Sequence, residues 1–99
     1  MRTCVERLIS TQNVDASIVR VEIQFLESTL ESLRINQQIS NDAYLDAGAI
    51  QGGLSMLANL IEHGIENDEI QQHFREILTR GAKLEQMHPD LDAMIESCR

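Results

Sequence analysis

The chain has 99 residues, and its 16 acidic and 8 basic side chains give it a formal net charge of −8. This charge disfavours direct binding to nucleic-acid phosphates and to anionic membrane surfaces, and it suits a basic protein partner. A chain of this length is expected to form one domain, residues 1–99. Hydrophobic residues make up 42% of the chain but aromatic residues only 3%, so we expect the core of this domain to be aliphatic.

The first predicted element is a short helix over residues 1–9. Its apolar residues recur at intervals of three and four and therefore share one helical face: Met1, Cys4, Val5 and Leu8. The segment lacks the apolar run of a secretory signal, and the chain has no stretch of about 20 apolar residues that would span a membrane. We therefore expect a cytoplasmic protein. Asn13 is the expected N-cap of the next helix.

Residues 14–38 form the first long predicted helix. Its main apolar seam has the alternating spacing of packed helices: Val19, Ile23, Leu26, Leu30 and Leu33. A second apolar stripe projects from another side of the same helix: Ile18, Val21, Phe25, Ile35 and Ile39. A helix with two apolar sides has to be covered on both of them.

The second long helix is predicted over residues 42–63. Its main seam repeats the same spacing: Ala43, Ala47, Ile50, Leu54, Leu57 and Ile61. Its second stripe has small residues in the middle and is flanked by Leu60: Leu45, Ala49, Gly52, Met56 and His63. Glycine inside a helix costs about 1 kcal/mol relative to alanine. The adjacent Gly52 and Gly53 therefore indicate either close approach of another backbone or a kink.

The third long helix is predicted over residues 68–87 and is expected to be capped by Asn67-Asp68. If Asp68 is the N-cap, Gln71 completes a capping box. Its seam gives it a single apolar face: Ile70, Phe74, Ile77, Gly81 and Leu84. The opposite face is basic, with Arg75, Arg80 and Lys83. The helix should end near His88, because proline disfavours helix in the preceding residue. Pro89 is expected as the first residue of a last short helix, whose apolar face is Leu91, Met94, Ile95 and Cys98.

These elements predict an all-α fold, an antiparallel bundle of three main helices (14–38, 42–63 and 68–87) with a short helical arm at each terminus. The arms are long enough to cover part of the second stripes. The first two long helices then retain more apolar surface than a three-helix monomer buries.

No motif in the chain indicates catalysis, a nucleotide or a metal, so we expect a non-enzymatic protein with no cofactor. Glu85 and His88 have the spacing of one half of a di-iron site, but the second half is missing. His63 is interpreted as an interface histidine. Cys4 and Cys98 are too few for a disulfide scaffold, and both are expected to be buried and reduced.

The surplus of apolar surface favours a small regulatory or adaptor protein, such as an anti-activator or a chaperone-like protein, that acts by protein–protein contact. We expect a homodimer that also binds another, unidentified protein, and no direct contact with nucleic acid or membrane. The candidate interface is Ile18, Val21, Phe25, Leu45, Ala49, Gly52, Met56, Leu60 and His63. The alternative is an acidic inhibitor that mimics nucleic acid and blocks a basic nucleic-acid-processing protein. Its acidic patch would be Glu62, Glu66, Asp68 and Glu69.

Overall fold

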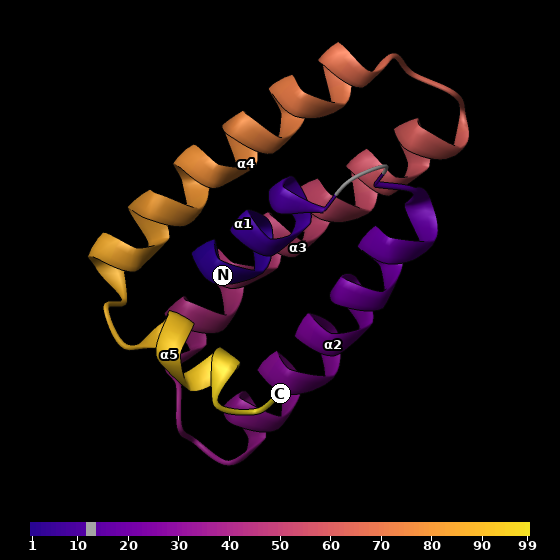
Figure 1. The fold of residues 1–99 in the computed structure, drawn as a ribbon. Coiled ribbons are helices and arrows are strands. Elements are labelled where there is room, and N and C mark those ends of the chain that lie inside the picture. Colours follow the sequence, from indigo (N-terminus) through magenta and orange to yellow (C-terminus); the bar gives the residue numbers. More distant parts are fainter. Residues whose placement is uncertain (12–13) are drawn as a thin grey trace.

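The computed structural model describes residues 1–11 and 14–99, and this part of the chain forms five helices and no strand. The helices are α1 (Arg2–Ser10), α2 (Ala16–Ile35), α3 (Asn41–Glu62), α4 (Asn67–Met87) and α5 (Leu91–Glu96), as Figure 1 shows. The predicted all-α class is confirmed.

The three long helices follow one another in a layer, with α3 packed against both α2 and α4. Consecutive long helices run in opposite directions (Figure 1). The short helix α1 packs against α4 and also contacts α2, while α5 contacts both α1 and α2. The two terminal helices therefore fill the space between α2 and α4 on one side of the layer.

The core is a single cluster to which all five helices contribute. The terminal helices supply buried residues of their own: Met1, Cys4, Val5, Leu8, Leu91 and Ile95. Phe74 is the largest fully buried side chain and the one aromatic residue among the buried core residues that the structure describes. The segments predicted as arms are thus an integral part of the packing.

The N-termini of α2 and α3 are capped by side chains. The Oδ1 atom of Asp15 accepts a hydrogen bond of 2.9 Å from the backbone N–H of Ile18. The Oγ atom of Ser40 accepts one of 3.0 Å from the N–H of Ala43. Each bond satisfies a donor that the first helical turn leaves unpaired. The predicted cap Asn13 lies outside the described residues.

Helix α4 begins at Asn67, with Glu66 in the N-cap position and no side-chain capping bond. The predicted capping box of Asp68 and Gln71 is therefore wrong. Gly64, in the turn that follows α3, has a φ of 82°, and α4 starts one residue earlier than expected. Asp68 lies in the first turn instead, where a negative charge still complements the helix dipole.

The connection from α4 to α5 is a turn around Pro89. Helix α4 ends at Met87 with His88 as its C-cap, as predicted. The backbone N–H of Leu91 then donates to the carbonyl of His88 over 3.1 Å. Proline is favoured at the second position of such a turn. Pro89 therefore precedes the Asp90 N-cap of α5, and the prediction that it opens the helix is wrong.

Candidate interaction surface

The second stripe of α3 is exposed. The side chains of Leu45 and Met56 are 68% and 62% accessible to solvent, and Ala49 and Gly52 between them are also exposed. Because these residues recur every three or four positions, they form one continuous apolar row along the helix. No other described element of the chain covers this row.

The other two residues of α3 that were predicted to lie in the interface, Leu60 and His63, differ in exposure. Leu60 is half-buried, while His63 is exposed and is the C-cap of the helix. The Nδ1–H of His63 donates to the carbonyl of Asn59 over 2.7 Å, one turn earlier. His63 therefore completes the helix end while remaining exposed.

The second stripe of α2 is only partly covered by the terminal helices. Ile18 and Phe25 are half-buried against the core, whereas Val21 is 66% exposed. The guanidinium of Arg99 lies over the Phe25 ring, 4.1 Å from its centre. Phe25 thus contacts Arg99 at the C-terminus, while the row on α3 borders grooves toward α2 and α4. The structure does not bring the two predicted stripes into one groove.

The glycines of α3 do not accommodate another backbone within the chain. A Cβ atom placed on Gly52 would have no atom within 4 Å, and one on Gly53 would contact the side chain of Ile77 at 3.5 Å. The atoms nearest to both glycines therefore show no close approach of another backbone inside the chain, which was one of the two reasons predicted for them. The helix itself is continuous from Asn41 to Glu62. Gly48 and Gly52 instead leave open space on the outer surface of α3.

Two grooves flank the exposed row. The groove toward α2 is lined by Leu30 and Tyr44 and by the small residues Gly48 and Gly52, and has a volume of about 280 Å³. The groove toward α4 is larger, about 350 Å³. Leu45 lines both grooves and therefore stands on the ridge between them.

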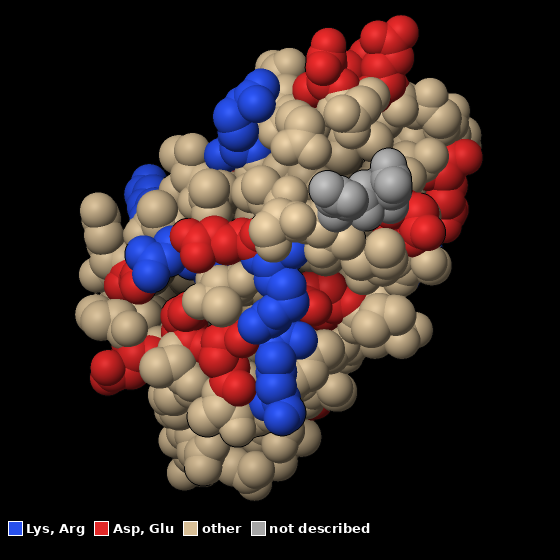
Figure 2. Space-filling view, in the orientation of Figure 1, with Lys and Arg blue, Asp and Glu red and all other residues tan. Residues whose placement is uncertain are grey.

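Some of the acidic side chains lie at the turn between α3 and α4, at the upper right of Figure 2, and others lie elsewhere on the same face. Glu62, Glu66, Asp68 and Glu69 are all exposed there. Glu62 is paired inside the chain, since its Oε1 lies 2.8 Å from the Nε of Arg20 on α2. This ion pair holds the pKa of Glu62 below its usual value. One of the four predicted acidic residues is thus already neutralised by a neighbouring helix.

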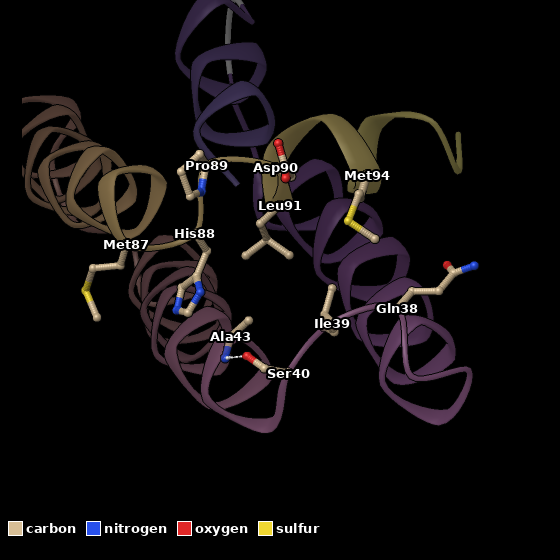
Figure 3. Close-up of a pocket in the computed structure, with 10 residues that line it drawn as sticks. All are labelled: Gln38, Ile39, Ser40, Ala43, Met87, His88, Pro89, Asp90, Leu91 and Met94. Atoms are coloured by element: carbon tan, nitrogen blue, oxygen red, sulfur yellow. Dashed lines mark hydrogen bonds between the residues drawn. The ribbon is translucent and has the colours of Figure 1, made fainter.

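A separate surface pocket of about 260 Å³ lies where the α2–α3 turn meets the α4–α5 turn (Figure 3). Ile39 and Leu91 point into it from opposite sides, and Met87 points away. The Nε2–H of His88 donates to Asp46 of α3 over 3.0 Å, and Ser40 is occupied as a helix cap. The pocket is smaller than typical ligand sites, and two of its polar groups already have structural partners.

Sequence reasoning missed a buried ionic cluster that joins the C-terminus to α2. Glu22 is only 6% exposed, and its carboxylate accepts a hydrogen bond from Arg99. Arg7 of α1 lies 3.7 Å from the same carboxylate. The position of Glu22, between Val19 and Leu26 on the apolar seam, was the available signal.

The two cysteines differ, and the prediction that both are buried is wrong for Cys98, which is exposed near the end of the chain. Cys4 is fully buried, and its Sγ donates to Glu96 over 3.3 Å. Burial, together with hydrogen bonds to Glu22 and Glu96, raises the pKa of Cys4 to about 12. Helix α5 ends at Glu96, which leaves Cys98 beyond the packed face.

We expect iodoacetamide at mildly alkaline pH to alkylate Cys98 and to spare Cys4 in the folded protein. The thiolate is the reactive form, and both burial and the raised pKa keep Cys4 protonated. Intact mass spectrometry should show one adduct under native conditions and two in denaturant. Equal rates of modification at both residues would contradict this description of Cys4.

No described group of three or more His, Cys, Asp or Glu side chains is arranged to hold a metal ion. No helix in residues 1–11 and 14–99 is long and apolar enough to cross a membrane. Comparisons of the chain with protein-family models, with curated proteins and with solved structures find no match.

Proposed function

We propose that this chain is a small, non-enzymatic, cytoplasmic interaction protein whose binding surface is the exposed apolar row on α3. The observation that carries the proposal is the exposure of Leu45 and Met56 on one helical face, with Ala49 and Gly52 between them. Large apolar side chains that stand in a row on a surface mark sites of protein contact. In this proposal α2, α3 and α4 form the antiparallel three-helix frame, and α1 and α5 are arms on its other side.

Self-association is the simplest way to cover this row. In a two-fold dimer the same surface of each copy meets its equivalent, so the row of one copy covers the row of the other. The open space at Gly48 and Gly52 supports this arrangement, because it allows two α3 helices to approach closely. The acidic-inhibitor alternative remains a prediction with less support, since Glu62 is engaged by Arg20.

The test is the oligomeric state of the wild type and of Gly52→Leu, measured by light scattering and sedimentation at high micromolar concentration. Leucine at this open helical position should stabilise the monomer by about 0.8–1 kcal/mol through helix propensity. The same side chain should weaken the dimer about tenfold or more, because it holds the two helices apart.

The matched control is Gln72→Leu, which adds the same side chain to an exposed position of α4 that lines neither groove. It should leave the dimer dissociation constant unchanged. A wild type that stays monomeric at high micromolar concentration, or a Gly52→Leu variant that dimerises like the wild type, would argue against self-association through this row.

A further inference from the structure

The charge around the groove between α3 and α4 is unusual for this acidic protein. Five of the eight basic side chains form ion pairs within the chain: Arg2, Arg7, Arg20, Arg34 and Arg99. The other three are Arg75, Arg80 and Lys83, and they make no ion pair with a described carboxylate. All three lie on α4.

Arg80 and Lys83 line the groove, and its walls are otherwise mainly apolar, with Leu45 and Ala49 on α3 and Met87 on α4. The guanidinium of Arg80 reaches across to α3, since its Nη1 lies 3.8 Å from where a Cβ atom on Gly53 would stand. The groove thus combines an apolar surface with two cations on one side.

Asp46 is the acidic residue that lines the same groove, and its carboxylate accepts the hydrogen bond from His88. It therefore faces the end of α4, and no ion pair joins it to Arg80 or Lys83 among the described residues. The two cations are left available to a ligand from outside.

We propose that the groove between α3 and α4 binds an amphipathic helix of another protein, with the apolar face of that helix on Leu45, Ala49 and Met87 and its acidic residues on Arg80 and Lys83. This inference rests on the proposed function, because Leu45 and Ala49 belong to the exposed row on α3. It adds the chemical class of the partner.

The dimensions of the groove suit a helix. The groove is lined by residues 80–87 of α4, which extend over about 10 Å, and by residues 45–50 of α3, which extend over about 8 Å, so each wall is about two turns long or slightly less. A bound helix offers anchors at intervals of three and four residues that match these lengths. A partner segment cannot bind as an added β-strand, because the described part of the chain has no sheet edge with which it could pair.

Charge complementarity favours an acidic helix over a second copy of this chain at the groove. In a symmetric dimer formed through this groove, the Arg80 and Lys83 side chains of both copies would be brought to the same interface. Like charges across an interface oppose association, whereas opposite charges set its specificity. An acidic partner helix and self-association would compete for Leu45 and Ala49.

The experiment uses two fluorescent synthetic peptides of about 18 residues, long enough to form a helix on binding. Both carry leucines at helical spacing on one face, and the flanking positions are glutamate in one peptide and lysine in the other. Fluorescence anisotropy should show that the full chain binds the glutamate peptide about tenfold or more tightly than the lysine peptide. Added salt should reduce this preference.

The variant Arg80→Glu/Lys83→Glu should reverse the preference between the peptides. Its matched control is Arg75→Glu, an exposed cation of the same helix that does not line the groove. The control should keep the preference of the wild type. Circular dichroism verifies that each variant folds, and the neutral Arg80→Gln/Lys83→Gln variant should bind both peptides equally.

Two results would overturn the inference while the proposed function stands: equal binding of both peptides that Leu45→Glu abolishes, or equal losses in Arg75→Glu and in Arg80→Glu/Lys83→Glu. Stronger binding of a single-stranded DNA probe than of the glutamate peptide would also overturn it, because the cations would then serve phosphates. The proposed function itself fails if Leu45→Glu changes neither peptide binding nor self-association.

Discussion

Replacing Phe74 by alanine should lower the free energy of unfolding by about 3–5 kcal/mol. Phe74 is the largest of the fully buried side chains and has no solvent exposure. It lies on α4, which packs against both α1 and α3, so the cavity would open where three helices meet. Domains have total stabilities of about 5–15 kcal/mol, so this loss would remove about a third to a half of the stability of a domain in the middle of that range.

Urea unfolding followed by circular dichroism measures this change. The matched control is Val21→Ala on α2, whose side chain is 66% exposed. It should change the free energy of unfolding by less than about 0.5 kcal/mol. A loss below about 1 kcal/mol for Phe74→Ala would contradict the placement of this side chain in the centre of the core.

Removing the Arg99 side chain should lower the free energy of unfolding by about 2 kcal/mol, because it leaves the buried carboxylate of Glu22 without its main partner. The expected loss is below that of a fully buried ion pair for two reasons. Arg99 retains partial exposure, and Arg7 remains 3.7 Å from the same carboxylate. The substitution Arg99→Ala also removes the contact with the Phe25 ring.

A double-mutant cycle isolates the ionic contribution. In the Glu22→Gln background the side chain at position 22 is neutral, so Arg99→Ala should cost about 1 kcal/mol less than in the wild type. Urea unfolding of the four proteins gives the coupling free energy. Additive losses would mean that Arg99 acts only through its packing on Phe25.

The long helices were predictable because the spacing of their apolar residues leaves few alternatives. Val19, Leu26 and Leu33 lie on one helical face in the sequence pattern, and all three are buried. The ends of the helices were less predictable, because several residues near each end are competent caps. Asp15 and Ser40 were selected by the geometry of the adjacent turns, which a sequence pattern does not contain.

The exposed row on α3 was also evident in sequence, since Leu45, Ala49 and Met56 recur apart from the main seam. The sequence did not show that the row would stay open while the similar stripe on α2 would be partly covered. That difference depends on where α1 and α5 pack, and short helices dock by tertiary contacts, not by local propensity. The position of Arg80 and Lys83 beside the row could not be predicted either, because it depends on how α4 packs against α3.

The two terminal helices fill one side of the helical layer. We expect them also to affect how cooperatively the chain unfolds. The Oγ of Thr3 donates to Asp92 over 2.5 Å, and the side chains of Arg7 and Glu96 pair at 2.6 Å, so both contacts close loops of nearly the whole chain. Contacts of this kind form only after the intervening helices are in place. We therefore expect fraying of α5 at one end of the sequence to weaken the packing of α1 at the other, although α1 also packs against α4.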